Sequence, residues 1–97
     1  MDVAATDGTP GLPLYLFIAG ANPSSVTARA NMQLALERFA TGHFAFEVVN
    51  VFEFPERALN NRVLVTPTLV APSCARRLIG DLSEASQLHY FLQTLPR

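Results

Sequence analysis

Cysteine and lysine are almost missing from this sequence of 97 residues. Cys74 is the only cysteine, which excludes an internal disulfide and a metal cluster built from thiolate ligands. A reducing cytoplasm is therefore the expected compartment. All seven basic residues are arginines, and the formal net charge is -1. A chain so nearly neutral has no overall field that would attract nucleic acid or an anionic membrane.

Long hydrophobic runs and targeting signals are also missing. No stretch approaches the roughly 18 apolar residues that a membrane-spanning helix needs. Residues 1–12 are small, acidic and contain glycine and proline, without the basic and apolar regions of a signal peptide. We expect them to form a disordered N-terminal tail. Residues 13–97 are long enough for one domain with one core.

The first half of the domain has the pattern of a β-α-β unit. A continuous apolar run at residues 14–19 predicts a buried central strand. A helix follows, with Asn22 as its cap and Pro23 in its first position, and it is expected to run to about Ala40 and to stop at Gly42. Residues 43–52 alternate as a second strand does, and such a unit has parallel strands and a right-handed crossover. The buried stripe of this helix is predicted to comprise Ala28, Met32, Ala35, Leu36 and Phe39.

The second half has weaker signals. Residues 55–61 form a short predicted helix, and residues 68–71 a third strand that begins after Pro67. A turn at Pro72 and Ser73 leads into a fourth strand within residues 75–81, paired as a hairpin. The last segment fits a helix capped by Ser83 better than it fits a strand. Its predicted buried face comprises Ala85, Leu88, Leu92 and Leu95.

The resulting order is β-α-β-α-β-β-α, an α/β protein of the thioredoxin-like type with a mixed four-stranded sheet. In such a sheet a proline that enters the third strand commonly follows a cis peptide bond, so we predict a cis bond before Pro67.

Catalytic chemistry is poorly represented. Thioredoxin-like redox enzymes place two cysteines at the start of the first helix, but residues 20–25 here read GANPSS. Ser24 and Ser25 would need a base, and only His43 and His89 are available. Both histidines fit exposed or edge positions better, and Asn22 and Ser25 fit helix caps. We predict no catalytic residue, no metal ligand and no cofactor, and a structural or incidental role for Cys74.

One cluster of charged residues is local in the sequence. It consists of Arg76, Arg77 and Asp81. It fits a solvated rim of the hairpin, and it also fits a pair of guanidinium groups for an acidic partner surface.

Several segments, in order and at preserved spacing, resemble the KaiB family of circadian clock proteins. They are LYLFIAGANPSSVTAR, FAFEVVNVFEFP, LVTPTLV and RRLIGDLS. The usual family patterns are similar to LYVAGNTPNSV, ALKVIDVLKNP, ILATPTL and RKIIGDLS, and the likeness spans residues 14–83.

The resemblance implies a partner protein without enzymatic activity. Members of the family bind the ring-shaped ATPase KaiC and, once bound, can sequester KaiA, in competition with a sensor histidine kinase. They also switch fold: a resting form, often a homo-oligomer, arranges the second half as strand-helix-helix-strand, and the thioredoxin-like form binds. This resting fold is the alternative to the fold class above.

Departures from the family pattern concern the switch. The loop after residue 69 is shorter by about two residues and keeps one proline, Pro72, where the family usually has three. Phe91 and Gln93 replace a usual glycine and aspartate, and both changes favour the terminal helix. With Pro67, these residues are the expected conformational positions. We expect the protein to rest in the thioredoxin-like form and to switch rarely or not at all.

The resemblance also implies partner contacts. Arg62 stands where the family has a lysine that matters for the ATPase contact, and it keeps the charge. The loop before the second helix contributes four candidates, with Phe54 in place of a polar residue: Phe52, Glu53, Phe54 and Pro55. Glu47 replaces a lysine in the region that meets KaiA, a charge reversal that weakens the case for KaiA as a partner.

Two other classes stay open. The chain resembles the thioredoxin-like sensory input domain of a clock histidine kinase, although no linker or coiled coil follows Arg97. A thioredoxin-like enzyme that uses glutathione or another thiol is the third class, and the cysteine-free turn disfavours it.

Overall fold

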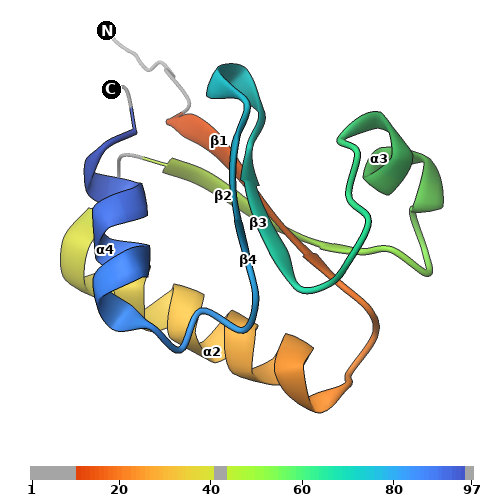
Figure 1. Ribbon diagram of the computed structural model, residues 1–97, viewed down its shortest axis with the longest axis horizontal. Helices are drawn as coiled ribbons and strands as arrows, with labels where there is room; N and C mark the ends of the chain where they lie inside the picture. The colour runs from red at the N-terminus through yellow and green to blue at the C-terminus, as the bar shows by residue number, and fades with distance from the viewer. Residues whose placement is uncertain (1–10, 41–43, 96–97) are drawn as a thin grey trace, which may run out of the picture.

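The computed structural model describes residues 11–40 and 44–95. It confirms the predicted α/β order and the mixed four-stranded sheet (Figure 1). The elements are β1 (Leu12–Ile18), α2 (Pro23–Ala35), a π-helical turn η1 (Leu36–Ala40), β2 (Phe44–Asn50), α3 (Pro55–Asn60), β3 (Thr68–Ala71), a 3-10 turn η2 (Pro72–Cys74), β4 (Arg76–Ile79) and α4 (Ala85–Gln93).

The sheet has the strand order β2-β1-β3-β4. β1 is parallel to β2, with Leu12 opposite Phe44 and Ile18 opposite Asn50. β3 is antiparallel to both β1 and β4, with Leu69 opposite Leu16 and Leu78. β1 begins two residues earlier than the sequence predicts, so residue 12 of the expected tail is part of the sheet, whereas residues 1–10 lie outside the described residues.

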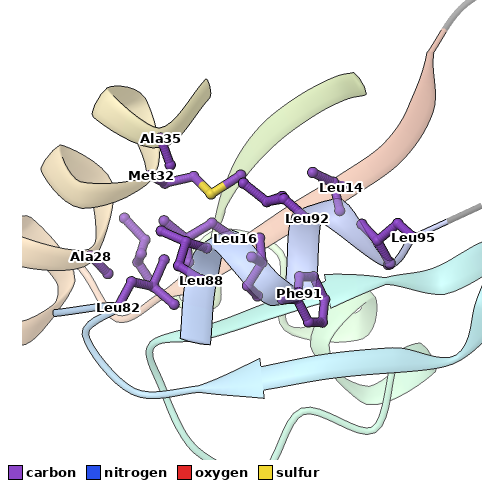
Figure 2. Packing of buried hydrophobic residues seen from close by; sticks show 13 residues of the cluster. Leu14, Leu16, Ala28, Met32, Ala35, Leu82, Leu88, Phe91, Leu92 and Leu95 are labelled. Atoms are coloured by element: carbon purple, nitrogen blue, oxygen red, sulfur yellow. The ribbon is translucent and has the colours of Figure 1, made fainter. Parts of the chain in front are cut away.

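The larger core lies between one face of the sheet and the helices α2 and α4 (Figure 2). Successive residues of a strand point to opposite faces, so Leu14, Leu16 and Ile18 of β1 all enter this core. Predicted members of the α2 stripe are confirmed at Ala28, Met32 and Ala35, all buried. Its last predicted member, Phe39, has a side chain outside the described ones.

A smaller core lies on the opposite face of the sheet, under α3. It consists of Phe17, Val49, Ala58 and Val70. Because α3 is only six residues long, it covers a small part of this face. Figure 1 shows α3 on the other side of the sheet from α2 and α4. One face of the sheet is therefore well covered and the other is largely open.

The start of α2 is partly as predicted. The Asn22 carboxamide oxygen accepts a hydrogen bond from the Ser25 backbone N–H at 2.9 Å, and Pro23 takes the first helical position. The prediction of Ser25 as a cap is wrong. Ser25 is fully buried, and its hydroxyl oxygen accepts the backbone N–H of Ala19 at 3.1 Å, so it joins the end of β1 to the helix instead. The predicted stop at Gly42 lies outside the described residues.

The start of α4 differs from the prediction. Ser83 is not the cap: the helix begins at Ala85, and the N-cap residue is Glu84, without a side-chain hydrogen bond. Ser83 instead donates its backbone N–H to the Asp81 carboxylate at 3.0 Å, and this local turn delays the helix.

The buried face of α4 is also shifted from the prediction. Leu88, Leu92 and Leu95 are buried as expected, but Ala85 is exposed and Phe91 is buried in its place. Phe91 follows Leu88 by three residues and precedes Leu95 by four, so these side chains share one face of the helix.

The hairpin and its entry agree with the prediction in most details. The Thr66–Pro67 peptide bond is cis, as predicted. The loop contains η2, and Ala75 turns the chain with φ +57°. Cys74 is half-buried against the larger core, and its thiol donates to the Ala71 carbonyl at 3.6 Å, which fits a structural role. Within the described ranges, no helix has the length and apolar character that a membrane crossing requires.

Candidate partner-binding surface

Large apolar side chains are exposed around α3 and the loops on either side of it. Phe52 is 73% exposed and Leu64 is 93% exposed. We call this set the apolar patch; it consists of Phe52, Phe54, Leu59, Leu64 and Val65. Contiguous exposed apolar surface of this kind marks interaction sites in soluble proteins, because it is otherwise costly to leave in water.

A groove of about 250 Å³ runs through the apolar patch. Its walls come from the end of β2 and from the segment before Pro67, and α3 lies between them. Ala58 of α3, only 8% exposed, is the most buried of the lining residues of α3 and the loops. The lining residues are Ala19, Val51, Phe52, Ala58, Val63, Leu64, Val65 and Thr66.

Asn50, the last residue of β2, organises one wall of the groove. Its side-chain oxygen accepts the backbone N–H of Gly20 at 3.2 Å and that of Phe52 at 3.1 Å. Its backbone carbonyl accepts the N–H groups of Glu53 and Phe54. One residue therefore fixes the loop that carries three of the predicted contact residues.

Replacing Asn50 by leucine is expected to lower the free energy of unfolding by about 1–3 kcal/mol, because two backbone donors lose their acceptor. Asn50→Asp keeps an acceptor oxygen and should cost less. Urea denaturation followed by circular dichroism measures both. Equal stability of the leucine variant and the unchanged protein would contradict this role.

Gly20 allows the Phe52 ring to lie over the loop after β1. Its φ is +63°, a conformation that side chains disfavour, and a Cβ atom there would lie 3.4 Å from the Phe52 ring. The glycine is therefore required both by the turn and by the position of the ring.

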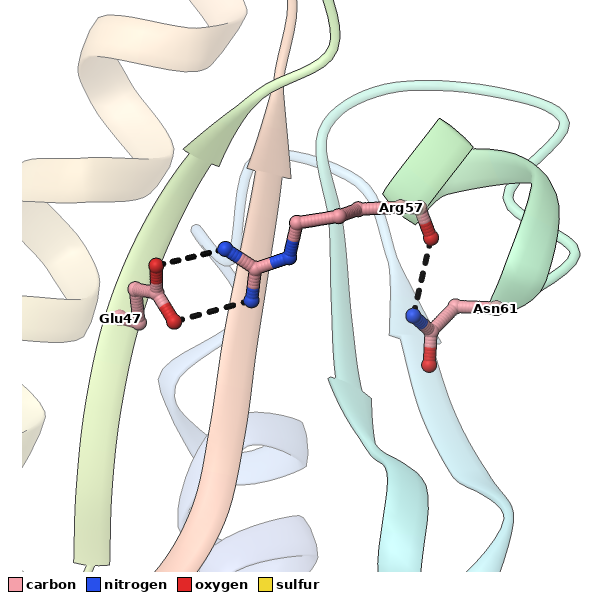
Figure 3. A network of polar contacts seen from close by, with 3 residues as sticks. All are labelled: Glu47, Arg57 and Asn61. Carbon is pink, nitrogen blue, oxygen red and sulfur yellow. Dashed lines mark hydrogen bonds and ion pairs between the residues drawn. The ribbon is translucent and has the colours of Figure 1, made fainter. Parts of the chain in front are cut away.

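Arg57 fastens α3 to the open face of the sheet (Figure 3). Its guanidinium group donates two hydrogen bonds to the Glu47 carboxylate of β2, at 2.7 and 2.9 Å. The same group lies 4.9 Å from the centre of the Tyr15 ring on β1. Asn61 donates its side-chain N–H to the Arg57 carbonyl at 2.9 Å, which closes the end of the helix. The contact therefore links α3 to two strands.

The hydrogen bonds from Arg57 hold the pKa of Glu47 below its ordinary value of 4.5. The stability that this pair contributes is therefore complete above that value and is lost as the pH falls through the lower pKa of the folded state. Because Glu47 is half-exposed, the contribution is about 0.2–1 kcal/mol.

Glu47→Gln should remove that part of the pH dependence. We expect the difference in unfolding free energy between the two proteins to be largest near neutral pH and to shrink below pH about 4, as measured by urea titrations. A difference that stays constant down to pH 2 would contradict the pairing.

Arg77 holds the other end of the same segment. It donates to the backbone carbonyls of Asn61 at 2.7 Å and Arg62 at 2.9 Å. Arg76 points to the opposite face, where it donates to the Thr94 hydroxyl at 2.6 Å and lies 5.0 Å from the centre of the Phe91 ring. Because neighbouring residues of β4 face opposite sides, these arginines do not form the guanidinium pair that the sequence left open.

The structure brings most of the predicted contact residues together. Phe52, Glu53 and Phe54 form the loop before α3, and Pro55 is the first residue of that helix. Arg62 follows α3 with φ +55° and is exposed. Glu47 lies apart from them on β2 and is already paired with Arg57. The conformational positions are dispersed: Pro67 enters β3, Pro72 lies in the hairpin loop, and Phe91 and Gln93 are on α4.

Several residues of the surface escaped the sequence interpretation. Leu59 and Leu64 looked like ordinary apolar residues, and nothing local marks Arg57 and Arg77 as anchors. Asn50 carried a usable signal, because it is a polar residue at the end of an apolar strand.

Catalytic and metal-binding arrangements find no support among the described residues. Ser24 donates to the Asn22 side chain at 3.2 Å, and Ser25 is buried. His89 lies on α4, and His43 is outside the described residues. No group of histidine, cysteine and acidic side chains that could hold a metal ion occurs in residues 11–40 and 44–95.

The strand order, the cis-proline entry to β3 and a first helix without cysteines define a thioredoxin-like domain that lacks the redox pair. A family model described as KaiB domain matches residues 15–94. The chain therefore belongs to the KaiB family.

Curated relatives agree with this assignment. The circadian clock oscillator protein KaiB of Gloeothece citriformis is 38% identical over 77 residues, which cover 77% of this chain and 73% of that protein. The proteins of the same name from Thermosynechococcus vestitus and Nostoc punctiforme are 39% and 36% identical over 77 residues, which cover 77% of this chain and 71% and 74% of theirs.

Among solved structures, the N-terminal domain of Synechococcus elongatus SasA is similar in fold. The TM-score is 0.65 at 23% sequence identity, and the match covers 100% of this chain and 97% of that domain. The likeness concerns the thioredoxin-like fold.

Proposed function

We propose that the protein is a non-enzymatic adaptor that binds a KaiC-type ATPase ring in the cytoplasm and modulates its activity or output in clock-related signalling. The observation that carries this proposal is the apolar patch, which a KaiB-family chain presents on the open face of a thioredoxin-like sheet. Asn50, Arg57 and Arg77 hold the patch in place, so it is ready for a partner without rearrangement.

In this proposal the contact residues are those of the loop before α3 and the loop after it. Phe52, Phe54 and Pro55 supply apolar area, and Glu53 and Arg62 supply charge at the two ends. Aromatic and arginine side chains commonly dominate the binding energy of protein interfaces. Glu47 acts indirectly, because its carboxylate holds Arg57 and thereby α3.

KaiA and a sensor histidine kinase are secondary partners in this proposal. Glu47 presents a carboxylate where the family usually has a lysine, and Arg57 partly neutralises it. A KaiA surface that complements a lysine would meet the opposite charge here.

The resting form is the thioredoxin-like one, because Phe91 anchors α4. Its side chain is 4% exposed in the larger core, and the Arg76 guanidinium lies over its ring. The exposed Gln93 is a better helix former than the aspartate that the family usually has.

The proposal is tested by mixing the purified protein with the KaiC-type ATPase of its host in ATP, in ADP and without nucleotide, followed by size-exclusion chromatography. We expect a complex in at least one nucleotide state. A folded protein that elutes separately under all three conditions would contradict the adaptor role.

A sensory domain similar to the input domain of a clock histidine kinase is the second candidate, since the SasA domain shares the fold over the whole chain. An immunoblot of the host extract separates the two. The adaptor runs near 10.6 kDa, and a sensory domain runs as part of a much larger kinase.

A further inference from the structure

We propose that the groove of the apolar patch is a docking site for a segment of a partner protein that inserts one apolar side chain and places a basic side chain against Glu53 and Glu56. This inference rests on the proposed function, because the ATPase ring is the expected source of the segment. It adds the chemistry by which that segment is selected.

The groove is shaped for an apolar side chain. It is lined mainly by aliphatic and aromatic groups, with Phe52 on one wall and Leu64 and Val65 on the other. Leu64 is 93% exposed, so a partner that covers it removes a whole leucine side chain from water. Such burial is worth about 1.5–3 kcal/mol for one side chain.

The wall before Pro67 also offers main-chain hydrogen bonds. Within residues 11–40 and 44–95, no hydrogen bond of the structure engages the backbone N–H of Leu64 or of Val65. Such donors can bind the carbonyl groups of a peptide, whereas hydrocarbon offers them no acceptor. This combination of groups favours a protein segment over a lipid.

The charges around the groove are unevenly placed. Glu53 and Glu56 are exposed, and no ion pair with another described residue neutralises either carboxylate. Glu56 lies three residues before Leu59, so the two share one face of α3. Arg57, the neighbouring cation, is already occupied by Glu47. The groove is therefore acidic on the side of α3.

Arg62 carries the opposite charge beyond the other end of α3. Its guanidinium group makes no ion pair in the part of the chain that the structure describes. A partner segment that has a basic residue near Glu53 and an acidic residue near Arg62 can dock in one orientation only. An anionic membrane would be repelled by the two glutamates.

The test uses three synthetic peptides with the full-length protein, followed by amide chemical shifts in NMR titrations. Each peptide has a central leucine in an alanine and glutamine background, and it is flanked by arginine, glutamate or only neutral residues. We expect the arginine peptide to shift the amides of Phe52, Leu64 and Val65 and to bind at least about tenfold more tightly than the glutamate peptide. Glu53→Lys with Glu56→Lys should reverse that order, and Glu84→Lys on α4 is the matched control.

The outcomes separate this inference from the proposed function. If the groove selects the arginine peptide while no ATPase complex forms, the docking chemistry stands and the adaptor role falls. If the ATPase binds while no peptide shifts the groove, or the charge-reversed variant binds the ring as tightly as the unchanged protein, the docking chemistry is wrong and the adaptor role stands. Binding to anionic vesicles without peptide selectivity would also overturn the inference.

Discussion

Replacing Phe91 by glycine is expected to lower the free energy of unfolding by about 4–6 kcal/mol. Truncation of a buried phenylalanine to alanine costs about 3–5 kcal/mol, and glycine costs a helix about 1 kcal/mol more than alanine. This total is a large share of the 5–15 kcal/mol that holds a typical domain folded. Urea denaturation of the two proteins, followed by circular dichroism, measures the difference.

The expected loss is local, because Phe91 joins α4 to the hairpin. Its ring packs in the larger core, and Arg76 of β4 lies over it while donating to Thr94 at the end of the helix. Without the ring, the terminal segment loses the feature that favours helix over strand.

Gln93→Asp is the matched control for Phe91→Gly. It restores the other family residue at an exposed position of the same helix and should change stability by at most about 0.5 kcal/mol. If Phe91→Gly were no more destabilising than Gln93→Asp, the anchoring role of Phe91 would be wrong.

Leu64→Arg is expected to weaken binding to the KaiC-type ATPase by about 30-fold or more, which corresponds to the 2 kcal/mol or more of an interface hot spot. The side chain is almost fully exposed, so the folded domain loses little packing. The arginine places a charge in an apolar contact that must exclude water. Titration of the ring by isothermal calorimetry measures the affinity.

Leu34→Arg controls for the general effect of adding a charge to an exposed leucine. Leu34 lies on α2 and is 57% exposed, away from the apolar patch. We expect it to bind the ring as the unchanged protein does. Equal losses for the two variants, or no loss for Leu64→Arg, would place the contact elsewhere.

Regular elements were predictable because their signals are local. The apolar runs that form β1 and β3, the Asn22-Pro23 start of α2 and the apolar spacing of α4 each follow from a few neighbouring residues. The family resemblance located the cis bond before Pro67 for the same reason, since it depends on a short motif.

The errors occurred where two local options compete. Ser83 and Glu84 are both plausible helix starts, and the Asp81 carboxylate decided between them by binding the Ser83 N–H. Ser25 resembles a cap in sequence, but burial against the end of β1 gives its hydroxyl another partner.

The support of the candidate surface could not be predicted, because its contacts join distant parts of the chain. Glu47 and Arg57 are ten residues apart, and Arg77 reaches carbonyls fifteen and sixteen residues before it. Sequence likeness indicated Phe52 and Arg62 as contacts, but only the fold shows that Leu59, Leu64 and Val65 join the same patch.

The central claim is that the free protein already has the thioredoxin-like arrangement that binds its partner. Backbone NMR shifts of residues 85–93, recorded before and after addition of the KaiC-type ATPase, test it most directly. We expect helical shifts at Leu88 and Leu92 in both samples. Strand shifts at these residues in the free protein, with a tetramer in solution, would contradict the account.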